Sequence, residues 1–311
     1  MNKIVKNIII FTVISVSTII VKSDSKIETE KEIIYNYYDI DDDISSIKVD
    51  SILEKIDKEY DIDRFSLDTK EDVESVLLLN AVIDNNKLSE EERELCYSMV
   101  PFYLDYDNLD RKSIYERLSN LDIIYSNKEI KVNATDTKGA TYYSDKNIII
   151  CRDKRNIVLK HELFHVSMPM TNFPKALREG LVSKLTKEYF YYNSDVSLPS
   201  TYREYMALIN SLTYIVDSDT LIEVASFNDL EKFKEVLLSK GSIMEDELNN
   251  IFSSLNKELN IRDKTKIVRK LVDSYPVLKE EPKALGYLEV YNLYDSSISD
   301  EYYFNKAKIK K

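Results

Sequence analysis

The placement of the histidines constrains this chain more than any other feature of its sequence. The 311 residues include only two, His161 and His165, which stand four residues apart with Glu162 directly after the first. Apolar side chains recur at helical spacing from Asn156 to Val166, which predicts a helix. Because four residues are just over one helical turn, both imidazoles project from the same face of that helix. The fold must therefore accommodate a mostly apolar helix with two imidazoles on one side.

Two imidazoles on one helical face can bind a single zinc ion, with Zn–N distances of ~2.0–2.1 Å. Glu162 can reach a metal-bound water without binding the metal, which suits it to the role of general base. The alternative is coincidence, since surface histidines on helices are common. The only two histidines of a chain should fall into this H-E-x-x-H pattern by chance on the order of once per thousand chains. The sequence thus predicts one Zn²⁺ per chain, held by His161 and His165.

A zinc site that keeps one position open for water needs a third protein ligand. The chain has no third histidine and no cysteine near the motif, so this ligand must be a carboxylate. The best candidate is Glu179, because apolar Ala176 and Val182 share its helical face and would turn it inward. Gly180 supports this choice, since a glycine inside a helix costs about 1 kcal/mol relative to alanine and suits a close approach of two helices. The alternatives are that Glu179 faces solvent beside a lysine, or that Glu188, further along the same helix, is the ligand.

Residues 161–165, H-E-L-F-H, and residues 178–181, R-E-G-L, resemble the gluzincin class of zinc metallopeptidases. The resemblance spans about Lys138 to Tyr191. It implies an α+β, zincin-like domain with a small sheet that has an edge strand, a motif helix and a following helix that bears a glutamate ligand. It also implies that His161, His165 and Glu179 bind zinc and that Glu162 is the general base. The strand Asn147–Cys151 resembles the family's edge strand, along which extended substrates pair.

This chain departs from the gluzincin pattern at two places. Many members have an aspartate four residues after the ligand glutamate, where this chain has Ser183, a weaker acceptor for orienting a histidine. Many also use a later histidine to stabilise the oxyanion, and this chain has none. A tyrosine or an arginine would have to take that role, and the candidates are Tyr202, Arg203, Tyr205 and Tyr214. With 23 tyrosines in the chain, any single one is more often a core or surface residue.

The N-terminal residues have the pattern of an export signal. Lys3 and Lys6 precede residues 7–21, which carry no charge, and Lys22 closes the run. Fifteen uncharged residues are short for a membrane span and fit the apolar region of a signal peptide. No clean cleavage site precedes residues 23–25, so an uncleaved membrane anchor is the alternative, and the lack of a following cysteine excludes a lipidated one. With its many Ile, Lys and Asn residues, the composition is typical of an AT-rich bacterial genome, which suggests an exported bacterial protein.

The net charge of −12 is spread along the chain. It argues against nucleic acid or an anionic membrane surface as a partner, because both favour clusters of Lys and Arg. The partner expected is a peptide or protein substrate, and the oligomeric state stays open. Cys96 and Cys151 could form a disulfide in an exported protein, or be two buried thiols, an alternative that is slightly favoured.

The sequence suggests four regions: 1–25 as signal peptide or anchor, 26–120 as an acidic, mostly helical region, 121–275 as the zincin-like domain and 276–311 as an extension. A helix start is expected at Ser89. A helix whose first turn contains Pro174 is expected to run to about Tyr191, with Thr171 or Asn172 as its cap. Strands are expected at Leu121–Tyr125, Glu129–Val132, Ala140–Tyr143 and Asn147–Cys151, the last two forming a hairpin.

The leading hypothesis from the sequence is a zinc metallopeptidase that hydrolyses peptide bonds outside the cytoplasm. A second hypothesis is a zinc-binding or interaction module of the same fold that has lost catalysis, against which the intact Glu162 argues. A third is an interaction protein in which the motif is accidental and the helical region before residue 120 carries the function.

Overall fold

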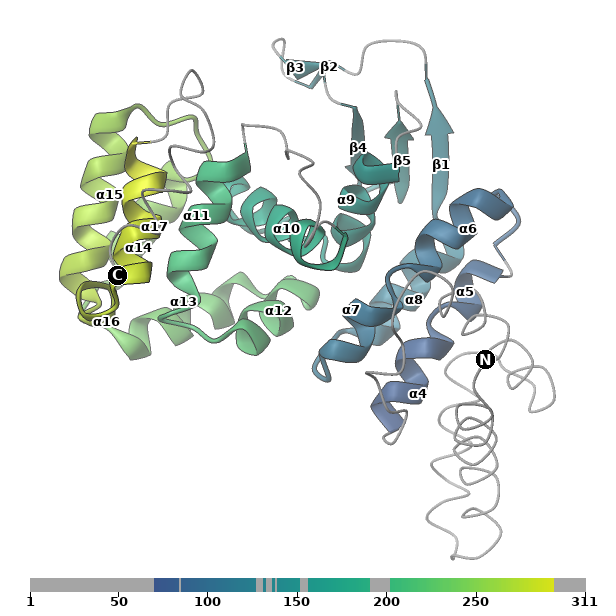
Figure 1. The fold of residues 1–311 in the computed structure, drawn as a ribbon, viewed down its shortest axis with the longest axis horizontal. Coiled ribbons are helices and arrows are strands. Elements are labelled where there is room, and N and C mark those ends of the chain that lie inside the picture. The colour runs from purple at the N-terminus through teal and green to yellow at the C-terminus, as the bar shows by residue number, and fades with distance from the viewer. Residues whose placement is uncertain are drawn as a thin grey trace, which may run out of the picture. The chain divides into compact units, whose positions relative to one another are not determined.

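The computed structural model describes residues 70–83, 85–126, 131–132, 136–137, 139–151, 156–190 and 202–293. The described part is mostly helical and contains one small mixed sheet (Figure 1). The chain divides into two compact units, Met1–Ser167 and Met168–Lys311. The expected signal segment, residues 1–25, lies outside the described residues. No helix within the described ranges is long and apolar enough to cross a membrane.

In the first unit, the described residues that precede the sheet form short helices with many buried apolar side chains. Ser89 begins one of them as predicted: its hydroxyl accepts a hydrogen bond from the N–H of Glu92, whose side chain in turn accepts one from the N–H of Ser89. This reciprocal arrangement satisfies two N–H groups that a helix start would otherwise leave unpaired. The helices are α4 (Lys70–Leu77), α5 (Asn80–Ile83), α6 (Glu90–Tyr97), α7 (Val100–Asp105) and α8 (Arg111–Asn120).

The sheet of the first unit has the strand order β1-β5-β4 (Figure 1). Strand β5 (Ile148–Cys151) pairs in parallel with β1 (Asp122–Tyr125) and antiparallel with β4 (Ala140–Tyr143). The expected hairpin is confirmed, but the assignment of 147–151 as the edge strand is wrong: β5 is central, and β4 is an edge strand. Within β5 the burial alternates: Ile149 and Cys151 are buried, whereas Ile148 and Ile150 are partly exposed. A separate pair joins β2 (Lys131–Val132) to β3 (Asp136–Thr137).

The motif helix α9 (Asn156–Ser167) lies against β4, β5, α6 and α8 within the first unit. Its range agrees with the prediction from the sequence. Leu163 and Phe164 are almost fully buried, and the ring of Phe164 meets that of Phe102 edge to face, with centroids 5.1 Å apart. Complete burial of a Leu or Phe side chain contributes about 1.5–3 kcal/mol. The two histidines thus sit on a helix that the surrounding core holds firmly.

The second unit is entirely helical in its described part. Helix α11 packs against both α10 and α17, and α15 packs against α17. Between α11 and α15, Lys264 forms an ion pair with Glu204, and both side chains are largely buried. The helices are α10 (Lys175–Phe190), α11 (Arg203–Leu212), α12 (Ser218–Ser226), α13 (Leu230–Lys240), α14 (Glu245–Ser254), α15 (Ile261–Ser274), α16 (Val277–Glu280) and α17 (Pro282–Leu293).

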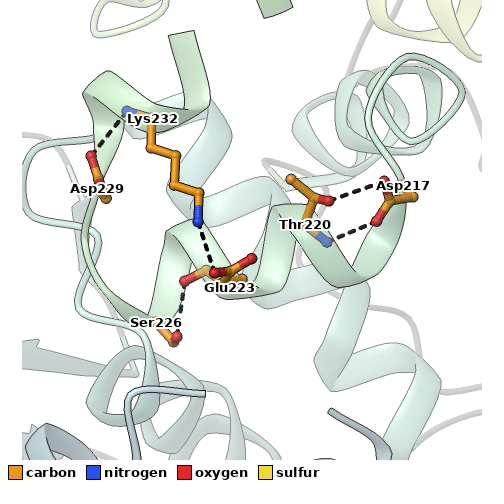
Figure 2. Close-up of polar contacts among 6 residues, drawn as sticks. All are labelled: Asp217, Thr220, Glu223, Ser226, Asp229 and Lys232. Carbon is orange, nitrogen blue, oxygen red and sulfur yellow. Dashed lines mark hydrogen bonds and ion pairs between the residues drawn. The ribbon is translucent and has the colours of Figure 1, made fainter. Parts of the chain in front are cut away.

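Aspartates cap the helices α12 and α13 (Figure 2). The Asp217 carboxylate accepts from the N–H and the hydroxyl of Thr220, at 2.8 and 3.0 Å. The Asp229 carboxylate accepts from the N–H of Lys232, whose ammonium reaches back to Glu223 of α12 at 2.8 Å. These contacts satisfy N–H groups at each helix start and tie the two helices together.

The start of α10 is capped by a residue far along the chain, which corrects the prediction of Thr171 or Asn172. The N–H of Lys175 donates to Oδ1 of Asn256 at 3.1 Å. Thr171 and Asn172 instead bond to Asn228: its Nδ2 donates to the Thr171 hydroxyl, and its Oδ1 accepts from the N–H of Asn172. Pro174 stands directly before the helix, which begins at Lys175, and not within its first turn as expected. The segment that leads into α10 is therefore fixed by non-local contacts.

The two cysteines do not form a disulfide, and both are buried. This outcome confirms the favoured alternative. Burial, followed by the charge of Glu92, raises the pKa of the Cys96 thiol to about 12. Cys96 is consequently an apolar packing residue at neutral pH.

Candidate metal centre

The two histidines of α9 face the same way, as their spacing predicts. Their ring centroids are 5.0 Å apart and the ring planes make an angle of 76°. His165 is 7% exposed, whereas His161 is partly exposed. The two imidazoles are close enough to bind one ion together. The partly exposed His161 would place that ion near solvent, while the buried His165 is held by the core.

Glu162 is buried, and its carboxylate is held by the backbone of the edge strand β4. The N–H of Tyr142 donates to Oε2 of Glu162 with 2.8 Å between nitrogen and oxygen. Since the neighbouring strand β5 lies on the other side of β4, this N–H is not used by the sheet. The bond fixes one of the two carboxylate oxygens.

Glu179 lies in the first half of α10 and is 6% exposed, which agrees with the expectation that it points inward. Its Oε1 is 3.6 Å from Nε of Arg178. Ala176 and Val182, which share its face, are fully buried. A carboxylate buried to this extent is costly unless a cation or several donors compensate it.

His161, His165 and Glu179 form a group that could hold a metal ion. One ligand atom from each, two imidazole nitrogens and a carboxylate oxygen, lies within 4.8 Å of the other two. This is the set of three that the sequence predicted. Among the described residues, these are three His, Cys, Asp or Glu side chains close enough together to share one ion.

The second ligand candidate, Glu188, is exposed and forms an ion pair with Lys184 on its own helix. Glu179 is buried, whereas Glu188 is exposed and paired with a lysine, so Glu179 is the better candidate for a metal ligand. Ser183, one turn after Glu179, is fully buried, and its hydroxyl has no hydrogen-bond partner among the described residues.

The candidates for oxyanion stabilisation lie on or beside α11. Tyr202 precedes the helix, Arg203 and Tyr205 are in its first turn, and Tyr214 follows its end. Tyr205 is buried, and its carbonyl lies against Gly180 of α10. The close approach expected at Gly180 is therefore made by α11.

Two contributors to the site were missed from the sequence. Tyr142 acts through its backbone N–H, so its side-chain type gives no signal. Arg117 of α8, one of 43 Lys and Arg residues, contacts the C-terminal end of α9. Only a correct assignment of β4 as an edge strand could have indicated the role of the Tyr142 N–H. Nothing in the sequence around Arg117 indicated its contact with α9.

The comparisons with known proteins add no family to this picture. No family model matches the sequence, no curated protein is similar to it, and no solved structure resembles it.

Proposed function

We propose that this chain is a zinc-dependent peptidase that acts outside the cytoplasm, on a peptide or protein substrate. The observation that carries the proposal is the group of His161, His165 and Glu179, whose ligand atoms lie within 4.8 Å of one another. The buried Glu162, held on the same helix as the histidines, is the general base. The apolar run at residues 7–21 supports export.

The residues present fit zinc better than other common metals. Two imidazoles and one carboxylate are a donor set that zinc uses in hydrolytic sites with one open position, whereas Ca²⁺ and Mg²⁺ favour oxygen ligands alone. The buried hydroxyl of Ser183 supports the fit, because an unsatisfied buried polar atom is uncommon in a finished site. Its position, one turn from Glu179, suits a contact with a group bound there.

The proposed chemistry divides between the ion and the chain. A bound Zn²⁺ supplies Lewis acidity, which polarises the scissile carbonyl and lowers the pKa of water toward ~7. Glu162 takes a proton from the attacking water at Oε1 and delivers it to the leaving amine nitrogen. The N–H of Tyr142 keeps the carboxylate oriented for both transfers through Oε2. Proton transfer by a positioned side chain contributes about 10²–10⁴-fold to the rate.

Strand β4 offers a place for an extended substrate. Within the described sheet it pairs with β5 alone, so the main-chain groups of its other edge that Glu162 does not use can form hydrogen bonds with a peptide. Because the N–H of Tyr142 already bonds to Glu162, a peptide added there lies directly beside the general base. This geometry supports a peptide bond as the substrate over a small ester.

The test compares the wild type with Glu162→Gln and with the control Glu188→Gln, which alters an exposed glutamate. Metal content is measured by elemental analysis and cleavage with a peptide library. We expect one zinc per chain in all three proteins, and cleavage that falls at least about 100-fold in Glu162→Gln alone. A wild type without zinc overturns the proposal. Zinc in every protein with cleavage in none overturns the enzyme and supports a zinc-binding module without catalysis.

A further inference from the structure

Arg117 of helix α8 holds the C-terminal end of the motif helix. Its Nε donates to the carbonyl of Val166 at 2.5 Å, and its Nη2 donates to the carbonyl of Ser167 at 3.0 Å. Helix α9 ends at Ser167, so these are carbonyls that no later turn of the helix can satisfy. The arginine thus replaces the hydrogen bonds that the helix lacks at this end, immediately after His165.

The charge of Arg117 suits this position. The C-terminus of a helix carries a partial negative charge, which favours a cation. Burial lowers the pKa of the guanidinium, although an arginine remains charged at any physiological pH. A planar fork with several N–H donors can bond two neighbouring carbonyls at once, which a lysine ammonium cannot do with the same fixed geometry.

The backbone of Arg117 connects to the other side of the motif helix. Its carbonyl accepts from Nδ2 of Asn147 at 2.6 Å, and Oδ1 of Asn147 accepts from the Tyr142 hydroxyl at 2.8 Å. The N–H of the same Tyr142 donates to Glu162. Asn147 has φ 54°, a left-handed conformation that asparagine tolerates better than most residues. One continuous set of contacts therefore joins the end of α9 to the carboxylate near its middle.

We propose that Arg117 is a positioning residue that holds α9 against strand β4, so that the two histidines and Glu162 keep their orientation. This role rests on the proposed peptidase function, since positioning matters only if the motif acts. It also gives the helical region before residue 121 a function. Through α8, that region supports the metal-binding helix.

A second contact from the same region supports this role. The hydroxyl of Tyr103 on α7 is 2.8 Å from the hydroxyl of Ser167, which donates to the carbonyl of Leu163. Tyr103 is almost fully buried. The last turn of α9 is thus held from two different helices.

The test uses Arg117→Met, with Arg111→Met as a matched control. Arg111 lies on the same helix and also donates to two carbonyls, those of Tyr106 and Asp107, but it bonds to α4 and the α7–α8 connection rather than to α9. Both variants lose a large, partly or fully buried arginine. Comparing them separates a general loss of stability from a specific effect on the motif helix.

Hydrogen–deuterium exchange of the α9 amides is measured first, because it needs neither zinc nor a substrate. We expect exchange at least tenfold faster in Arg117→Met than in Arg111→Met. Zinc affinity should fall about tenfold, and kcat should fall by more than KM rises, in Arg117→Met only. Arg117→Lys, which keeps the charge without the fork, should recover part of each loss. Equal behaviour of the two methionine variants in all these measurements overturns the positioning role.

Asn147→Asp keeps the acceptor for Tyr142 but removes the donor to the Arg117 carbonyl. If Arg117→Met does not fold, this variant tests the same connection, with the expectation of a lower kcat and an unchanged zinc content. An unchanged kcat overturns the proposal. A wild type that neither binds zinc nor cleaves peptides refutes the proposed function, while the exchange data still decide whether Arg117 holds α9.

Discussion

The backbone N–H of Tyr142 donates to Oε2 of Glu162 across 2.8 Å, joining the edge strand of the sheet to the motif helix. A main-chain donor persists through almost every substitution of its residue. The strand also fixes the direction of this N–H, so no side chain has to be ordered for the hydrogen bond to form. Only proline removes it.

Tyr142→Pro tests this bond, with Tyr142→Ala as the control that keeps the N–H. Because this N–H is not part of the β4–β5 ladder, proline at this edge position removes no sheet hydrogen bond. We expect peptide cleavage about tenfold or more lower in Tyr142→Pro than in Tyr142→Ala, with equal zinc content, since a general base must be held in reach of its proton. Equal rates in the two variants would show that the bond has no part in orienting Glu162.

Glu179→Gln tests the third ligand, with Glu188→Gln as a control on the same helix. Loss of the carboxylate charge should lower zinc affinity by more than about 100-fold, since even residues that only orient ligands cost 10–100-fold. The control should bind zinc as tightly as the wild type, because Glu188 is exposed and paired with Lys184. Competition with a coloured chelator measures both affinities. If Glu188→Gln lost more zinc affinity than Glu179→Gln, Glu188 would be the ligand.

Gly180→Ala should destabilise the second unit although alanine favours a helix by about 1 kcal/mol. A Cβ at this position would meet the backbone oxygen of Tyr205 at 2.5 Å, and backbone cannot move aside. The expected net loss is about 1–3 kcal/mol in the free energy of unfolding, measured with urea. Gly139→Ala is the control: the nearest atoms to its Cβ would be the Val158 methyls, at 3.3 Å, and the change should cost less than about 1 kcal/mol. Equal losses would contradict the close approach of α10 and α11.

Asp217, which caps α12, gives a prediction about pH (Figure 2). Hydrogen bonding to the backbone of Thr220 lowers the pKa of its carboxyl. A carboxyl whose pKa is lower in the folded state stabilises the fold above its unfolded value of about 3.9, and this contribution is lost as pH falls through the folded value. Asp217→Asn should therefore be less stable than the wild type at pH 6, and the difference should shrink toward pH 3. Asp217→Ala should lose about 0.5–2 kcal/mol at pH 6. A difference that stays constant between pH 6 and pH 3 would contradict the cap.

The ranges of α9 and α10 and the inward position of Glu179 could be predicted because they depend on local pattern. Helical periodicity fixes which residues share a face, and a proline marks the start of α10. The cap of α10 could not be found this way, since Asn256 lies 81 residues from the Lys175 that it contacts. Contacts across such distances depend on the packing of whole helices.

The strand order was the main error in the sheet. Apolar alternation identifies a strand but not its neighbours, and the family resemblance that marks residues 147–151 as the edge strand does not determine the strand order of this chain. The true edge strand, β4, carries the N–H that holds Glu162. Arg117 was missed for a related reason: the value of an arginine at a helix end depends on a tertiary contact that its neighbours in sequence do not encode.

The two pairings of β5 also differ in the length of chain that each must close. Four residues, 144–147, separate β5 from β4, whereas 22 residues, 126–147, separate it from β1. Shorter loops lose less entropy on closing, and so the hairpin should form before the parallel pair during folding. On this order of folding, the Tyr142 N–H that bonds to Glu162 should be in place before β1 pairs with β5.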